Sequence, residues 1–273
     1  MDRLTPARLL ELDARLSERE REIAATVAQL RLVSGRQLER LFFDGGGARQ
    51  SNARLARKTL SRLVSIGVLR RLQRRVGGVR AGSAAFVYET GPAGQRLLAY
   101  WQGEGIARTR GAHEPGGAFL AHTLAVAEVY VRLREAARIS KLELVSFAAE
   151  PDCWREFLGP VGQRVTLKPD IHLRLGLDEF EDSWFVEVDR ATESSAVIRR
   201  QCEAYIAYYR SGREQANSGV FPRVLWIVPH GKRAQLIAQV IDALPSDAHR
   251  LFAVTTEEEA FAVLVGRKSG GRP

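Results

Sequence analysis

The sequence predicts an α+β protein of two domains, in which three helices and a basic hairpin precede a mixed β-sheet flanked by helices. Three observations lead to this prediction: paired helix-start motifs near the N-terminus, a strongly uneven charge distribution, and helix-like and strand-like segments that alternate in the second half. With 273 residues and 45 % hydrophobic content, the chain is long enough to bury two cores.

The N-terminal region carries the start signals of two helices and the pattern of a third. Ser17 with Glu20, and Ser34 with Gln37, have the spacing of capping boxes, so helices are expected to end near residue 33 and residue 42. A third helix is expected over about residues 50–65. Its inward positions are predicted to be Leu55, Leu60, Leu63 and Val64.

A hairpin is predicted directly after these helices. Residues 68–75 and 84–90 are strand-like, and the segment between them is rich in Gly and Arg. Gly91-Pro92 then opens a helix over residues 91–101. Three helices followed by a basic hairpin are the pattern of a winged helix-turn-helix, whose third helix enters the major groove while the hairpin lies along the phosphates.

The net charge of +9 is confined to the first part of the chain. Residues 1–110 contain 21 Lys and Arg against 10 Asp and Glu, whereas residues 111–273 contain 20 against 22. Residues 49–80 hold ten cationic side chains and no acid. Cations gathered in this way repel one another, so double-stranded DNA is the expected partner rather than solvent alone.

The predicted DNA contacts follow from this interpretation. Gln50 and Asn52 are expected to read base edges, and the remaining contacts are cations of the third helix and the hairpin: Arg49, Arg54, Arg57, Lys58, Arg62, Arg71, Arg74, Arg75 and Arg80. A winged helix that only docks proteins, or one that acts as a transcriptional regulator, is left open by the sequence.

Composition indicates a cytoplasmic protein. No apolar run reaches transmembrane length, and the N-terminus is too charged for a secretory signal. No membrane partner is therefore expected. Cys153 and Cys202 are far apart and lack the spacing of zinc ligands, so they are expected to be buried fillers.

The chain is expected to divide into a DNA-binding domain (1–102), a linker (103–117) and a second domain (118–273). The linker is rich in Gly, Pro and Arg and has no periodicity. After it, helical patterns cover residues 118–138, 194–210 and 231–244, and strand-like runs cover residues 141–150, 167–175, 183–191, 222–230 and 250–256. This order predicts a mixed sheet flanked by helices.

Acidic residues lie on two neighbouring strands of this predicted sheet. Lys168, Asp170 and His172 are expected to share one face of the first strand, and Glu187 and Asp189 share one face of the second. If the two faces coincide, Asp170, Glu187 and Asp189 form a cluster that suits a hard cation such as Mg²⁺.

The segments AHTLAVAEVY, KPDIHLRL, WFVEVDRATE and AYIAYYRSG, behind a basic winged helix, resemble the replication-relaxation family of plasmids and mobile elements. The order of elements, with PD at 169–170 and E-x-D at 187–189, also resembles the core of the PD-(D/E)xK nuclease superfamily. The superfamily implies Asp170 and Glu187 as metal ligands, Glu128 as a third acid, and Gln201 as a helix residue near the site. The narrower family implies a role in plasmid replication or in relaxation of plasmid DNA for transfer, with replication or relaxase proteins as partners.

One departure separates this chain from the nuclease pattern. Asp189 stands where the superfamily has the Lys that positions the attacking water, and Lys168 is the candidate that is best placed to substitute for it. Three interpretations remain open: a Mg²⁺-dependent endonuclease or nickase, a nuclease-derived but silent domain in which Asp189 pairs with Arg190, Lys168 or Arg199, and acids that merely lie at exposed strand ends. The silent domain is preferred because the missing Lys removes a catalytic role. Oligomeric state is left open, with a homodimer as one option.

Overall fold

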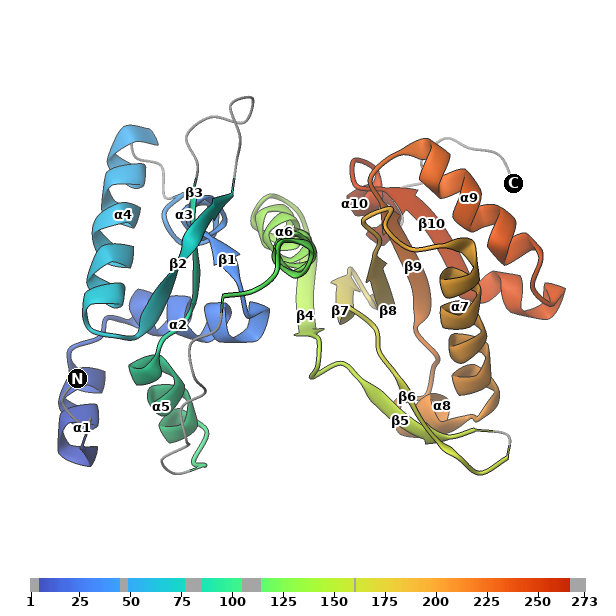
Figure 1. The fold of residues 1–273 in the computed structure, drawn as a ribbon, viewed down its shortest axis with the longest axis horizontal. Helices are drawn as coiled ribbons and strands as arrows, with labels where there is room; N and C mark the ends of the chain where they lie inside the picture. Colours follow the sequence, from blue (N-terminus) through green and yellow to red (C-terminus); the bar gives the residue numbers. More distant parts are fainter. Residues whose placement is uncertain (1–4, 45–48, 77–84, 105–113, 160, 266–273) are drawn as a thin grey trace. The chain divides into compact units, whose positions relative to one another are not determined.

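The computed structural model describes residues 5–44, 49–76, 85–104, 114–159 and 161–265. Over these residues the chain is an α+β protein that forms two compact units, Met1–Val131 (unit 1) and Arg132–Pro273 (unit 2) (Figure 1). The predicted mixture of helices and a mixed sheet is confirmed. Among the helices described, none has both the length and the apolar character needed to cross a membrane.

The helices of unit 1 begin where the sequence places their caps. Helix α2 (Glu18–Leu30) is capped by Ser17 and helix α3 (Gly35–Phe42) by Ser34, and both capping boxes are complete. Helix α4 (Arg49–Ser65) matches the expected third helix, and helix α5 (Pro92–Trp101) the closing one. A first helix, α1 (Pro6–Ala14), was not predicted.

A small antiparallel sheet follows α4. Strands β2 (Leu69–Val76) and β3 (Ala85–Thr90) pair as the predicted hairpin, and a two-residue strand, β1 (Val33–Ser34), adds to β3 to give the order β1-β3-β2. The short strand was not expected from sequence, because two residues carry no alternation pattern.

The predicted inward face of α4 is partly wrong. Leu55 is 45 % exposed, whereas Ala56, Leu60 and Leu63 are buried. A helix turns about 100° per residue, so Ala56 and Leu55 cannot face the same way. Ala56 therefore occupies the core position that was predicted for Leu55.

Helix α6 (Gly117–Ile139) crosses the division between the two units, which therefore lies further along the chain than the expected linker. Its first half belongs to unit 1, where Leu120 and Leu124 pack with a core cluster that also contains Leu32, Leu72 and Val87. Most of the expected linker, residues 105–113, lies outside the described residues.

Unit 2 is built on a five-stranded mixed sheet in the order β10-β9-β8-β7-β4. Strands β4 (Leu142–Ala149), β7 (Ile171–Leu177) and β8 (Phe180–Val188) are antiparallel neighbours, while β9 (Arg223–Val228) and β10 (Phe252–Thr256) continue parallel to β8. The intervening helices are α7 (Ser195–Arg210), α8 (Arg213–Ser218), α9 (Gly231–Asp242) and a 3₁₀ turn, η1 (Ser246–Leu251); α10 (Ala260–Leu264) follows β10.

The region before β7 differs from the sequence prediction. The irregular loop expected there contains a hairpin of β5 (Arg155–Leu158) and β6 (Arg164–Leu167). The expected continuous strand over 167–175 is interrupted at Lys168-Pro169-Asp170, because Pro169 has no N–H to donate to a ladder. Asp170 consequently lies just before β7 rather than within it.

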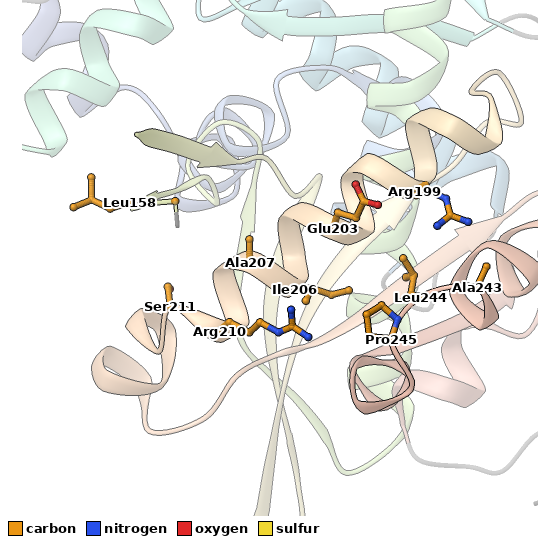
Figure 2. A pocket seen from close by; sticks show the side chains of 11 residues that line it. Leu158, Arg199, Glu203, Ile206, Ala207, Arg210, Ser211, Ala243, Leu244 and Pro245 are labelled. Atoms are coloured by element: carbon orange, nitrogen blue, oxygen red, sulfur yellow. The ribbon is translucent and has the colours of Figure 1, made fainter. Parts of the chain in front are cut away.

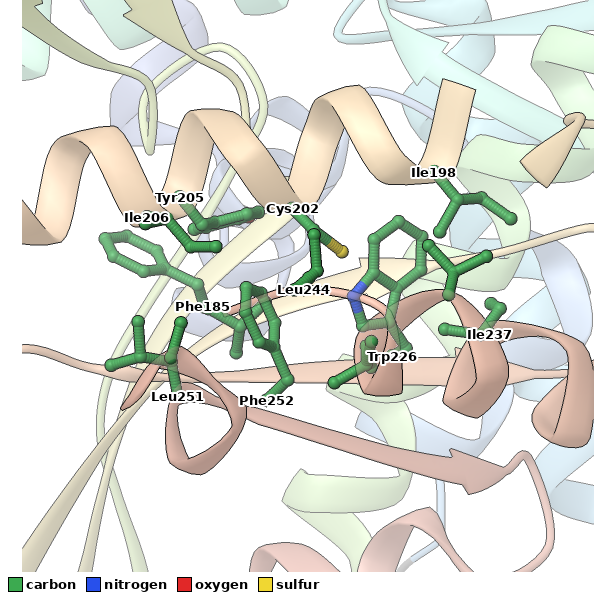
Figure 3. Close-up of a cluster of buried hydrophobic side chains, with 14 of the residues drawn as sticks. Phe185, Ile198, Cys202, Tyr205, Ile206, Trp226, Ile237, Leu244, Leu251 and Phe252 are labelled. Carbon is green, nitrogen blue, oxygen red and sulfur yellow. The ribbon is translucent and has the colours of Figure 1, made fainter. Parts of the chain in front are cut away.

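Helices α7 and α9 cover one face of the sheet through a large apolar core. Phe185 of β8 and Trp226 of β9 pack against Ile198, Cys202 and Tyr205 of α7 and Ile237 of α9 (Figure 3). Cys202 and Cys153 are both free and buried, as the sequence predicts. This core fixes α7 over the sheet face that carries the acids.

We expect Gly94→Ala to destabilise the protein by about 1–3 kcal/mol, although Ala favours helices. A Cβ atom on Gly94, within α5, would lie 2.2 Å from the backbone oxygen of Val68. Gly231→Ala, in the first turn of α9, is the matched control, because a Cβ there meets no atom within 4 Å. Thermal unfolding of both variants would measure the difference, and an unchanged melting temperature for Gly94→Ala would contradict the close contact.

Candidate functional site

Three acidic residues lie in a row across one end of the unit 2 sheet. The pairing of Ile171 with Val186 sets Asp170 opposite Glu187, and the amide of Glu150 donates to the Asp170 carbonyl at 3.0 Å, which extends the row to the end of β4. Opposite residues of antiparallel strands share a face. The predicted meeting of Asp170 with Glu187 is therefore found, and Glu150 joins them.

Glu187 is buried at the β8 end of this row. It is 5 % exposed and accepts a hydrogen bond from the hydroxyl of Tyr205 on α7. Burial, and then the nearby charge of Asp170, raise the pKa of Glu187 well above its ordinary value. The folded protein therefore keeps the Glu187 carboxyl protonated over a wider pH range than the unfolded chain does.

Asp170 is half-buried and bound to the neighbouring strand. Its Oδ2 atom accepts the backbone N–H of Val188 at 2.7 Å. The bond occupies the backbone N–H of Val188, the last residue of β8. Val188 follows Glu187, the acid that lies opposite Asp170. Asp170 thus continues the β7–β8 pairing with a side chain where Pro169 has interrupted the strand.

Asp189, in the position of the missing Lys, is held by Arg233 of α9. The guanidinium Nε and Nη2 atoms donate to the two carboxylate oxygens of Asp189, both at 2.7 Å, and Nη2 also donates to the carbonyl of Glu193 at 2.9 Å. Both Asp189 and Arg233 are buried, at 6 % and 7 % exposed. Such a bidentate pair neutralises the Asp189 charge.

The cations that the sequence proposed for Asp189 lie elsewhere. Arg190 pairs with Glu257 at 2.9 Å, and Lys168 lies 4.6 Å from the ring centroid of Trp154. Arg199 is an exposed residue of α7. The interpretation that the acids sit at exposed strand ends is also wrong, because Glu187 and Asp189 are both buried.

Gln201 contacts an acid that sequence reasoning missed. It forms a side-chain hydrogen bond with Glu193, and this bond lowers the pKa of Glu193. Burial and the charge of Asp189 raise the same pKa, and the net direction is upward. Glu193 also contributes to the raised pKa of Glu187. Neither Glu193 nor Arg233 stands out in the sequence, because the loop and the helix that carry them come close only in the folded chain. Glu150 did offer a signal in the sequence, since this acid directly follows an apolar strand.

Glu128, the implied third acid, has a different role in unit 1. Its Oε1 atom accepts from Arg40 Nη1 at 2.7 Å and its Oε2 atom from Gln37 Nε2 at 3.1 Å. Gln37 also donates to the Leu124 carbonyl at 3.0 Å. These contacts fasten the first half of α6 to α3.

Asp189 does not offer its oxygens to a Mg²⁺ ion in this arrangement. A hard cation needs several ionised oxygens directed at one point, but both oxygens of Asp189 accept hydrogen bonds from Arg233. Over the described part of the chain, no group of three or more His, Cys, Asp or Glu side chains is placed to hold a metal ion.

The basic face predicted in unit 1 is only partly exposed. Gln50, Arg54, Arg57 and Lys58 are exposed on α4, and Asn52 is half-buried. Arg62 instead pairs with Glu20 of α2 and donates to the Arg15 carbonyl at 3.2 Å.

The remaining cations belong to α4 and the hairpin. Arg71 of β2 lies 4.2 Å from the centroid of the Phe86 ring on β3. Arg49 begins α4, and Arg74 and Arg75 belong to β2, but their side chains, like the whole of Arg80, lie outside the described residues.

The family model for replication-relaxation matches residues 25–224, which cover most of both units. The chain belongs to the replication-relaxation family. No curated protein and no solved structure matches the chain. Membership of the replication-relaxation family suggests a role in replication or relaxation of plasmids or mobile elements. The match runs from within α2 into β9, so it includes α4, Asp170, Glu187 and Asp189 but ends before Arg233.

Glu187→Gln should stabilise this replication-relaxation protein at neutral pH and have little effect near pH 4. The folded-state pKa of Glu187 is raised above its ordinary value of 4.5. Above pH 4.5 the Glu187 carboxyl loses its proton in the unfolded chain but keeps it in the folded chain. The wild type therefore loses stability as pH rises until the folded-state pKa is reached. The loss is up to about 1.4 kcal/mol per pH unit. Gln keeps an acceptor for Tyr205 and has no proton to lose.

Urea unfolding from pH 4 to pH 8 would measure this difference. Glu179→Gln, an exposed position at the β7–β8 turn, is the control and should follow the wild type. A stability difference between Glu187→Gln and wild type that is the same at every pH would show that Glu187 is not protonated in the fold.

Proposed function

We propose that this protein binds double-stranded DNA in replication or relaxation of a plasmid or mobile element, and that unit 1 is a winged helix that makes the contact. The observation that carries this proposal is the exposed cationic face of α4, in a stretch of 32 residues that contains no acid. Arg54 and Lys58 are one turn apart, and Arg57 lies beside them, so the three cations project together from one side of the helix.

The elements around α4 support this proposal. Helices α2, α3 and α4 precede the β2–β3 hairpin, the order in which a winged helix presents its third helix to the major groove and its hairpin to the backbone. Gln50 and Asn52, in the first turn of α4, are the proposed readers of base edges. Arg71 is the proposed hairpin contact on the phosphates. Arg62 is withdrawn from the set, because it is paired with Glu20.

Unit 2 has the proposed role of an assembly platform rather than a nuclease. Glu187 is bound by Tyr205, and Asp189 by Arg233, so each acid already has a partner within the fold. The Asp189–Arg233 pair places a buried ion network where the nuclease pattern has its Lys, in line with the silent domain preferred from sequence. Replication or relaxase proteins, or a second copy of the chain, are the proposed partners in the cytoplasm.

Replacing Arg54, Arg57 and Lys58 together by Ala should weaken DNA binding and flatten its dependence on salt. Each phosphate contact contributes about −0.9 to the slope of log affinity against log salt, so a loss of roughly two to three units is expected if all three touch phosphate. Fluorescence anisotropy with a labelled duplex over a range of salt concentrations measures the slope.

The matched control removes three exposed cations of unit 2, Lys141, Arg164 and Lys232. It lowers the net charge equally, and its slope should stay close to that of the wild type. Equal losses in both triple variants would mean that overall charge, and not α4, governs binding.

An active metal-dependent endonuclease is the second candidate, favoured by the row of Glu150, Asp170 and Glu187 at one end of the sheet. The proposal of a silent domain predicts that supercoiled plasmid incubated with the protein and Mg²⁺ or Mn²⁺ stays supercoiled. Open-circular or linear product that disappears in Asp170→Ala and in Glu187→Gln would instead establish the nuclease.

A further inference from the structure

Leu55 is an apolar side chain on the solvent-facing side of α4. It is 45 % exposed, whereas Leu60 and Leu63 of the same helix are buried. Ala56, the residue after it, occupies the core position instead. The core of unit 1 therefore leaves a large part of the Leu55 side chain in water.

The neighbours of Leu55 on α4 are polar and cationic. A helix turns about 100° per residue, so Ser51 lies about 40° and Lys58 about 60° from Leu55 around the helix axis. Both residues are exposed, and so is Arg54, the residue before Leu55. Residues 49–80 contain no acid. The surface around Leu55 thus presents a hydroxyl group and two cations beside one apolar group.

Two other apolar places in the described residues show what is particular to Leu55. Leu10 of α1 is 50 % exposed, but its helix also carries the acids Glu11 and Asp13. In unit 2, Ile206 and Leu244 line a hollow beside α7 (Figure 2), yet both are buried members of the core. A single exposed leucine needs no partner by itself. The acid-free, cationic surroundings are what distinguish Leu55.

These surroundings favour the major groove of double-stranded DNA as the place where Leu55 is covered. Lysine and arginine carry their charge at the end of a long stem, so Arg54 and Lys58 can reach past a leucine to phosphates. The leucine is shorter and stays near the helix, close to the base edges. The apolar group that a base offers there is the 5-methyl of thymine. One duplex therefore supplies both the anions for the cations and an apolar group for the leucine.

We propose that Leu55 is a specificity-determining residue, which contacts the 5-methyl group of a thymine in the major groove. The inference rests on the proposed function, because it requires α4 to lie in that groove. It adds a base preference, since cations on phosphates position a helix but carry no sequence information. The contact also favours DNA over RNA, because uracil has no 5-methyl group and side chains cannot read the deep, narrow major groove of an RNA helix.

The test compares thymine with deoxyuridine, which lacks only the methyl group and keeps the base pairing and the phosphate charge. Enrichment of duplexes from a random pool with the full-length protein supplies a preferred sequence. Each thymine of that duplex is then replaced in turn by deoxyuridine, and affinity is measured by competition in fluorescence anisotropy. The wild type should lose about fourfold in affinity at one thymine, the change that corresponds to one buried methyl group. Leu55→Ala should show no such loss at that thymine.

Two further variants are the controls. Leu10→Ala shortens a leucine of similar exposure outside α4, so it should respond to deoxyuridine as the wild type does. Leu55→Met keeps an apolar side chain of similar volume and should retain the response. Thermal unfolding checks that each variant is folded. Loss of the response in Leu10→Ala as well as in Leu55→Ala would place its cause outside α4 and overturn the inference.

The remaining outcomes separate this inference from the proposed function. Equal sensitivity of the wild type and Leu55→Ala at every thymine, or no thymine whose methyl group matters, overturns the role of Leu55. A pool without a preferred sequence also overturns it, but a salt slope that still depends on Arg54, Arg57 and Lys58 leaves the proposed function standing. Absence of binding to every duplex would remove the proposed function itself, together with the thymine contact.

Discussion

The buried ion pair between Asp189 and Arg233 is the constraint on which the arrangement of unit 2 depends. It joins the end of β8 to α9 across a sequence separation of 44 residues, and Arg233 also binds the carbonyl of Glu193 in the loop before α7. A buried carboxylate without a partner would be strongly destabilising, so α9 and this loop have to stay in place together. The core of Phe185, Trp226 and α7 then closes over the acids and keeps water from Glu187.

This pair also changes what the end of β8 can do. A lysine two residues after Glu187 would carry a free ammonium group, able to orient water or to meet a phosphate. Arg233 also brings a positive charge to this place, but its guanidinium group donates to the Asp189 carboxylate and to the Glu193 carbonyl. Arg233 is only 7 % exposed, so it is not free to meet water or a phosphate. Glu128 has been committed in a similar way, to Arg40 and Gln37 in unit 1. Asp189, which stands in place of the pattern's Lys, and Glu128, which the pattern implies, therefore both contribute to holding the fold.

Sequence reasoning succeeded where the signal is local. The capping boxes at Ser17 and Ser34 are complete within four residues, and both helices start where these motifs place them. The meeting of Asp170 with Glu187 followed from strand alternation and a short turn. The prediction was wrong where packing decides which of two adjacent residues is buried, as with Ala56 in place of Leu55. The pairing of Asp189 with Arg233 was missed because these residues are distant in the chain. The hairpin β5–β6 was missed because its strands are only four residues long.

Helix α6 belongs to both units, and this has a consequence for how such proteins can be recombined. Its first turns supply Leu120, Leu124 and Glu128 to the core and polar contacts of unit 1, while Arg132, the first residue of unit 2, donates to the Glu257 carbonyl at 2.6 Å. A crossover between genes that exchanged residues 1–102 alone would separate Leu32 and Leu72 from the leucines that cover them. The module that is inherited with residues 1–102 therefore includes α6 at least as far as Glu128, and it is longer than the Gly- and Pro-rich stretch before α6 suggests.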